Sequence, residues 1–141
     1  MAGGAKLQDE DYELVHEFRT AIRRFLKYSK TQAEEVGLTP AQHQLLLAVR
    51  GHRDAYPTIG DIAELLLIRH HSAVELIDRA ERAGLIERRR DPNDQRVVRL
   101  ALSRSGASKL QRVSEANLLE IRRLGREFRD VWTTLERLSD R

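Results

Sequence analysis

Arginine side chains gather in one short stretch of the chain, residues 85–103, which contains five of them. A guanidinium group stays charged and offers several hydrogen-bond donors, so this stretch predicts recognition of anions such as phosphates. Four of these arginines are expected to remain available for phosphates or for a nucleic-acid groove, namely Arg88, Arg90, Arg96 and Arg99. Clustered arginine of this kind is typical of a nucleic-acid contact, although a merely solvated basic surface is the alternative.

The same stretch has the pattern of a β-hairpin. Asp91-Pro92-Asn93-Asp94 predicts a tight turn with Pro92 at its second position. Beyond the turn, apolar and polar residues alternate, which indicates a strand with one face on a core and the other in water. The expected inward set is Val98, Leu100 and Leu102, and the outward set is Val97, Arg99 and Ala101.

Helical patterns precede and follow this hairpin. We expect helices at residues 9–36, 40–50, 69–83 and from 103 nearly to the C-terminus, with a two-turn helix after Thr58. Thr39, Thr58 and Ser103 are suitable N-caps, and Gly37 and Gly84 suit helix ends. The two-turn helix should turn Ile62, Ala63, Leu65 and Leu66 inward, while Gly106 and Gly125 should weaken the last helix locally.

Composition narrows the class of protein. The chain has 141 residues, 40% of them hydrophobic, which suits one domain with an ordinary core. It contains no cysteine, which excludes disulfides and thiolate metal sites, and its net charge is +3. No apolar run reaches the roughly 20 residues that span a bilayer, and residues 1–6 lack the apolar stretch of a signal peptide, so we expect a cytoplasmic protein. Nucleophile, phosphate-loop and zinc-hydrolase motifs are absent, so neither an enzyme nor a cofactor is expected.

Two short helices followed by a hairpin have the order of a winged helix-turn-helix. The hairpin pattern Asp94-x-Arg96-x-x-x-Leu100-x-Leu102-Ser103 is similar to the wing signature of the MarR family, the multiple-antibiotic-resistance regulators. Supporting matches are Leu38-Thr39-x-x-Gln42, Ile62-Ala63-x-x-Leu66 and Ile77-Asp78-Arg79-x-Glu81-x-x-Gly84-Leu85. The chain departs from the family at Leu67, where a turn glycine is common, at Arg69, where a Ser or Thr cap is common, and at Glu75.

The resemblance implies a mainly α fold with a small β-hairpin wing, a winged helix-turn-helix flanked by N- and C-terminal dimerisation helices. It implies one MarR-type domain over residues 1–141. Within it, residues 38–103 would form the winged helix-turn-helix DNA-binding part, and residues 7–36 and 104–139 the helical dimerisation part.

Double-stranded DNA is the partner that the resemblance implies, with the second short helix in the major groove and the wing in the minor groove. Arg96 is expected to enter the minor groove while Asp94 orients it; the alternative is an ion pair that only closes the turn. His70 and His71 point about 100° apart on a helix, so no metal site is expected. The expected DNA-binding residues are Arg69, His70, His71, Ser72, Arg79, Arg88, Arg90, Asp94 and Arg96.

The apolar stripes of the two terminal helices exceed what one small winged domain covers, so we expect a homodimer rather than a monomer core. A two-fold dimer predicts a pseudo-palindromic operator. The expected dimerisation residues are Val15, Phe18, Ile22, Phe128, Val131, Trp132 and Leu135.

These features together predict a dimeric transcription regulator. By resemblance it would be a repressor relieved by a small aromatic or phenolic effector. His43, Arg50 and His52 lie near the expected effector crevice, and the alternative is that they are ordinary polar surface residues. The alternative function is a winged-helix module that binds protein or RNA without regulating a promoter, and it would show no operator preference.

Overall fold

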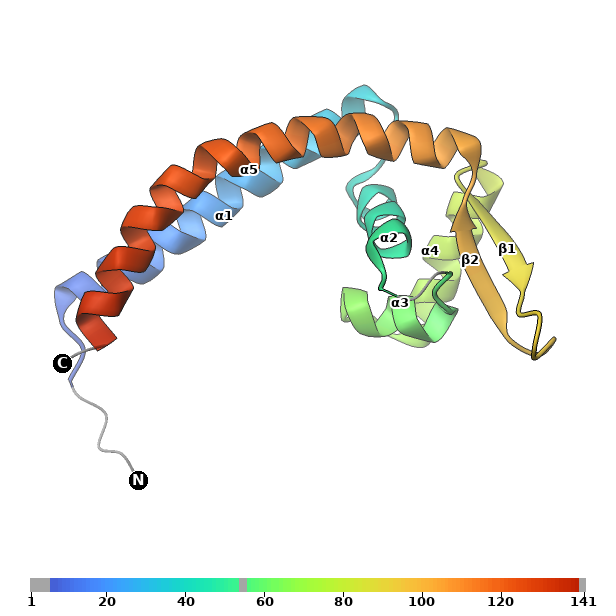
Figure 1. Ribbon diagram of the computed structural model, residues 1–141, viewed down its shortest axis with the longest axis horizontal. Coiled ribbons are helices and arrows are strands. Elements are labelled where there is room, and N and C mark those ends of the chain that lie inside the picture. Colours follow the sequence, from blue (N-terminus) through green and yellow to red (C-terminus); the bar gives the residue numbers. More distant parts are fainter. Residues whose placement is uncertain (1–5, 54–55, 140–141) are drawn as a thin grey trace. The chain divides into compact units, whose positions relative to one another are not determined.

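The computed structural model describes residues 6–53 and 56–139; the expectation about a signal peptide falls mostly on residues 1–5, which lie outside them. Its elements are α1 (Asp9–Glu35), α2 (Pro40–Gly51), α3 (Ile59–Leu66), α4 (His70–Arg82), β1 (Ile86–Arg90), β2 (Val98–Leu102) and α5 (Arg104–Ser139) (Figure 1). This order confirms the predicted helical fold with one hairpin. Every helix in the described ranges is too short or too polar to cross a lipid bilayer.

The chain divides into two compact units. Residues 30–114 form the winged unit, and residues 1–29 with 115–141 form the helix-pair unit. In the winged unit, side chains from three helices and β2 are fully buried together: Leu45, Leu46, Ile62, Ile77 and Leu100. Each contributes about 1.5–3 kcal/mol by leaving water, so this core fixes α4 and the hairpin relative to each other.

The predicted N-caps Thr39 and Thr58 are confirmed, and each forms a capping box at the start of α2 or α3. The Thr58 hydroxyl accepts from the Asp61 N–H at 3.1 Å, and the Asp61 carboxylate accepts from the Thr58 N–H at 2.9 Å. That last bond holds the pKa of Asp61 below its usual value. Two of the unpaired donors at the start of α3 are thereby satisfied.

The turn between α3 and α4 is closed by Leu67 in a left-handed conformation, with φ 54° and ψ 41°. Its side chain is 92% exposed. A residue with a Cβ atom is about 1–2 kcal/mol less stable than glycine in this conformation. The departure from a turn glycine at this position therefore leaves a strained leucine in the helix-turn-helix.

β1 and β2 pair antiparallel, with Arg88 opposite Leu100, which confirms the hairpin. The predicted position of the tight turn is wrong, because the backbone hydrogen bond of a turn joins the Val97 N–H to the Asp94 carbonyl at 3.0 Å. The Asp91 carboxylate holds the preceding residues instead, since it accepts from the N–H groups of Asn93 at 2.7 Å and Asp94 at 3.0 Å. The connection between the strands therefore spans residues 91–97.

Two expectations about side-chain burial are also wrong. Ala101, expected in water, is buried, and Leu65, expected inward, is exposed. The segment before α3 lies along the edge of β2, where the Leu100 N–H donates to the Pro57 carbonyl at 2.9 Å. The strand therefore has a neighbour on each side.

Gly106 lies where α5 leaves the hairpin. A Cβ atom added there would lie 2.2 Å from the Leu85 carbonyl oxygen, which already accepts from the Ser103 N–H at 3.0 Å. Ser103 caps the helix as predicted, because its hydroxyl accepts from the Gly106 N–H at 2.9 Å. The expectation that Gly106 only weakens the helix is incomplete, since glycine is needed for this close approach.

In the helix-pair unit, α1 packs on α5 through Leu14, Ala21, Leu124 and Val131, which are buried. The rings of Phe18 and Phe128 meet edge to face with centroids 5.6 Å apart. A buried hydrogen bond of 3.0 Å joins the Asn117 amide to the Ser29 hydroxyl. These contacts leave the other faces of both helices uncovered.

Candidate nucleic-acid interface

The N-terminal turn of α4 is exposed and carries cationic or polar side chains. Arg69 occupies the N-cap position and makes no capping hydrogen bond through its side chain. Arg69, His70 and His71 are exposed and Ser72 is half-buried, whereas Ala73 and Ile77 on the inner face are fully buried. Uncapped N–H groups at a helix start attract anionic oxygens, so this turn can bind phosphate.

Arg79 extends the outer face of α4. It is exposed and follows Ser72 by seven residues, which is two helical turns or about 10 Å along the same face. Of the residues predicted at α4, Arg69, His70, His71 and Arg79 are therefore solvent-exposed, and Ser72 is half-buried. Among the described residues, no group of three or more His, Cys, Asp or Glu side chains could hold a metal ion.

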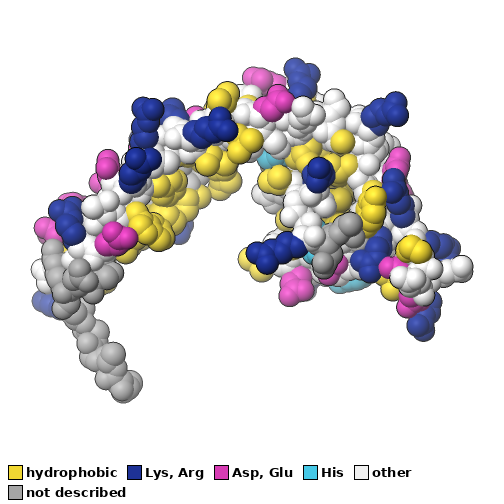
Figure 2. Space-filling model, in the orientation of Figure 1, with side chains coloured by type: hydrophobic (Ala, Val, Ile, Leu, Met, Phe, Trp, Pro, Cys, Tyr) yellow, Lys and Arg dark blue, Asp and Glu magenta, His cyan; other side chains and the backbone are white. Residues whose placement is uncertain are grey.

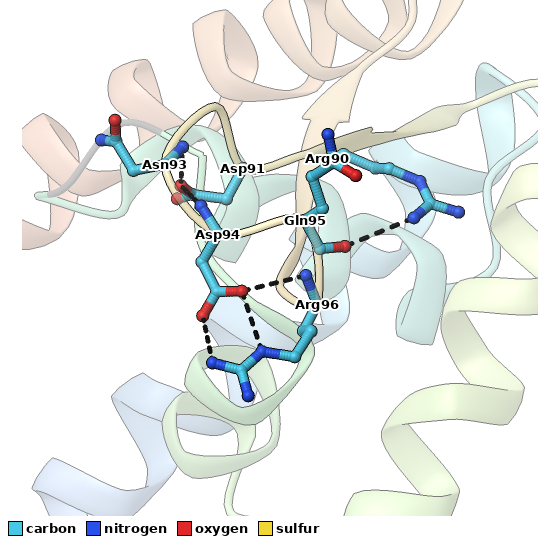
Figure 3. Close-up of polar contacts among 6 residues, drawn as sticks. All are labelled: Arg90, Asp91, Asn93, Asp94, Gln95 and Arg96. Carbon is cyan, nitrogen blue, oxygen red and sulfur yellow. Dashed lines mark hydrogen bonds and ion pairs between the residues drawn. The ribbon is translucent and has the colours of Figure 1, made fainter.

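At the end of the hairpin, Asp94 holds the guanidinium group of Arg96 (Figure 3). Arg96 donates to the two carboxylate oxygens from Nε at 3.1 Å and from Nη2 at 3.4 Å, and its backbone N–H donates to Oδ1 at 3.1 Å. The Arg96 side-chain bond is the main reason that the pKa of Asp94 lies below its usual value. The Arg96 side chain is still 91% exposed, so this cation is oriented without being covered.

Arg99 has a different environment. Its Nε donates to the Asp91 carboxylate at 2.5 Å and its Nη1 to the Tyr56 carbonyl at 3.1 Å. The bond from Arg99 also does most to hold the pKa of Asp91 below its usual value. The expectation that Arg99 is available for phosphate is therefore wrong in this structure, because it ties the hairpin to the segment before α3.

Arg88 and Arg90 lie on one face of β1, but one guanidinium group is engaged in ion pairs and the other is not. Arg88 forms ion pairs with Asp78 and Glu81 of α4. Among the described residues, Arg90 makes only a 3.4 Å hydrogen bond, to the Gln95 carbonyl (Figure 3). Arg90 thus remains available for phosphate. Arg88 is already paired with two carboxylates, so the expectation that its guanidinium is available is wrong. A direct contact between Arg88 and DNA stays a prediction.

Sequence reasoning did not predict the contact between Tyr56 and Arg89. The Arg89 guanidinium lies over the Tyr56 ring, 5.1 Å from its centroid, and Tyr56 has a φ of 63°. The sequence carries no signal for this pair, because a positive φ at tyrosine and the stack both depend on how the segment meets β2.

The residues considered for an effector crevice separate in the structure. His43 is buried, its Nε2 has no hydrogen-bond partner among the described residues, and burial lowers its pKa. It is therefore not a surface residue. Arg50 and His52 line a hollow of about 490 Å³ in the winged unit, together with Arg53 and Arg89.

The predicted dimerisation residues lie on the helix-pair unit. Val15 and Trp132 are 58% and 59% exposed, and Phe128 is half-buried. Val131 is buried within the protomer, so it stabilises the α1 and α5 pair and is not a surface residue. Figure 2 shows hydrophobic side chains gathered along one side of this pair. The exposed members of the predicted set are Val15, Phe18, Ile22, Trp132 and Leu135.

The second helix of this helix-turn-helix has an exposed, cationic N-terminus, and an arginine-bearing hairpin follows it. These features define a winged helix-turn-helix of the DNA-binding class. The chain belongs to the MarR family, whose members are DNA-binding transcription regulators rather than enzymes. The family model described as MarR family matches residues 36–96.

Relatives of known name agree with this assignment. The chain is 33% identical over 122 residues to the uncharacterized HTH-type transcriptional regulator YsmB of Bacillus subtilis (strain 168). The matched region covers 84% of this chain and 82% of YsmB. It is 31% identical over 80 residues to the HTH-type transcriptional repressor MdtR of the same strain, covering 57% of this chain but only 50% of MdtR.

Solved structures share the fold. The transcriptional repressor CouR bound to a 23-mer DNA duplex matches with a TM-score of 0.67 and 28% identity, over 97% of this chain and 100% of CouR. The MarR family transcription regulator SP03579 matches with a TM-score of 0.74 and 20% identity, over 94% of this chain and 86% of that chain.

Proposed function

We propose that this protein is a homodimeric transcriptional repressor that binds a pseudo-palindromic operator and is released by a small aromatic or phenolic effector. The observation that carries the DNA-binding mode is the pairing of Asp94 with Arg96, which presents an oriented and exposed guanidinium group at the end of the hairpin. Such a group suits a narrow, electronegative minor groove, while the N-terminal turn of α4 reads the adjacent major groove. The repressor named CouR, solved on a 23-mer DNA duplex, supports binding to double-stranded DNA.

The dimer is proposed from the uncovered apolar face of the helix-pair unit. Val15, Ile22, Trp132 and Leu135 are large hydrophobic side chains that are exposed in the protomer. A second copy of the same face would bury them. Two-fold symmetry would place the two α4 helices on half-sites about one helical turn apart.

The effector is proposed to bind the hollow at Arg50, His52, Arg53 and Arg89. Buried Leu100 and Ala101 also line this hollow, so it combines cations with an apolar surface. A small aromatic acid matches both properties. Because Arg89 belongs to β1, a ligand held there would act directly on the wing.

Selection of bound sequences from random duplex DNA tests the proposal with the whole chain. We expect enrichment of inverted repeats with half-site centres about 10 base pairs apart. Repeating the selection with benzoate or 4-hydroxybenzoate should reduce recovery. Enrichment of a single half-site would contradict the dimer, and no enrichment at all would contradict the regulatory function. An affinity for DNA that does not fall with rising salt would exclude phosphate contacts.

A further inference from the structure

Arg88 links the wing, formed by β1 and β2, to α4, the helix proposed to read the major groove. Its Nε donates to the Glu81 carboxylate at 3.2 Å, and its Nη2 contacts the Asp78 carboxylate. Asp78 and Glu81 are three residues apart on α4 and therefore lie on one face of that helix. One side chain of β1 thus bridges two carboxylates of the element that faces the major groove.

Arg90 provides a natural comparison. It lies two residues further along β1, on the same face of the strand, and the described residues offer its guanidinium only the Gln95 carbonyl at 3.4 Å. Arg88 would have to leave two carboxylates before it could reach a phosphate, whereas Arg90 would leave one long neutral hydrogen bond. The two arginines therefore differ in what binding to DNA would require of them.

We propose that Arg88 is a positioning residue, which fixes the orientation of the wing relative to α4 and does not itself contact DNA. This inference rests on the proposed DNA-binding function. A protein that must engage two grooves at once binds more weakly if one reading element is in the right orientation only part of the time. If loss of the Arg88 ion pairs leaves the wing correctly oriented about a tenth of the time, the apparent Kd rises about tenfold.

Salt dependence separates positioning from phosphate contact. Binding to a duplex recovered by the wild-type protein is measured over a range of salt concentrations for Arg88→Gln and for its matched control Arg90→Gln. We expect Arg88→Gln to weaken binding about tenfold with an unchanged slope of log K against log salt, and Arg90→Gln to reduce the slope by about 0.9 per protomer, or about 1.8 for the dimer. A slope reduced by the same amount in Arg88→Gln would overturn the proposal.

Removal of the carboxylates gives predictions of opposite sign. In the double variant Asp78→Asn with Glu81→Gln, a positioning role predicts weaker DNA binding, because the wing loses its anchor. If Arg88 instead bound phosphate, the same variant would free it and remove two repelling charges, so binding would strengthen. Equal or stronger binding would therefore refute the positioning role.

A measurement without DNA distinguishes this inference from the proposed function. Amide hydrogen exchange in the free protein should be faster at residues 86–90 in Arg88→Gln than in Arg90→Gln, at temperatures where both variants are folded. Equal exchange in the two variants would show that Arg88 does not anchor the wing. If the wild-type protein recovers no duplex in the selection, the proposed DNA-binding function is refuted. The exchange comparison would still show whether Arg88 anchors the wing to α4.

Discussion

Replacing Gly106 with alanine is expected to destabilise the protein, although alanine is the better helix former. Gly106 lies in the first turn of α5, where a Cβ atom would come within 2.2 Å of the Leu85 carbonyl oxygen. Real Cβ atoms essentially never come closer than 3.0 Å to a non-bonded heavy atom, so the first turn of α5 and the segment between α4 and β1 must separate by about 1 Å. That movement also disturbs the 3.0 Å hydrogen bond from the Ser103 N–H to the same oxygen.

The magnitude follows from three effects. Forced overpacking costs about 1–3 kcal/mol, and weakening a backbone hydrogen bond costs about 1 kcal/mol. The higher helix propensity of alanine offsets about 1 kcal/mol. The net loss for Gly106→Ala is therefore about 2 kcal/mol, which corresponds to a fall in Tm of roughly 6–10 °C for a chain of this size.

Gly125 is the matched control in the same helix. A Cβ atom there meets nothing within 4 Å in the protomer, so Gly125→Ala should raise stability by up to about 1 kcal/mol. Denaturant unfolding at one fixed protein concentration compares both variants with the wild type, since association contributes to the stability of a dimer. If Gly106→Ala matched the wild type within about 0.5 kcal/mol, the close approach of α5 to Leu85 would be wrong.

Three further changes have definite expected outcomes. Leu67→Gly should stabilise the protein by about 1 kcal/mol in chemical unfolding, because it removes left-handed strain; a loss of stability would show that Leu67 makes contacts that the structure lacks. His43→Leu should reduce the loss of stability on acidification. Burial lowers the pKa of His43 in the folded state, so the unfolded state takes the proton first as pH falls below about 6.5, and a pH series of Tm values measures this. Asp94→Asn should weaken DNA binding about tenfold while Arg96 remains, as titration of labelled duplex would show, and unchanged affinity would mean that Arg96 needs no orientation.

The parts of the fold that sequence predicted well are those determined by neighbours along the chain. The caps at Thr39 and Thr58 and the left-handed glycines at Gly37 and Gly84 all act within four residues. Their spacing alone therefore indicated where helices begin and end.

The errors occurred where a residue's environment is set by distant segments. The Asp91 carboxylate forms hydrogen bonds to the loop and to Arg99, and this displaced the tight turn to Asp94–Val97. The partners of Arg88 lie seven and ten residues before it, in another element, so only the packing of β1 on α4 could identify them. A count of arginines in the sequence does not distinguish the ones that the fold neutralises.

The five arginines of the hairpin therefore divide by the groups within their reach. Asp78, Glu81 and Asp91 neutralise Arg88 and Arg99, and Arg89 lies 3.7 Å from the Glu87 carboxylate. Arg96 is paired but solvent-exposed, and Arg90 makes no ion pair among the described residues. Each arginine that displaces a counterion from duplex DNA adds about 0.9 to the salt slope. The wing of one protomer should consequently contribute about 2 to that slope, where five free arginines would contribute about 4.5.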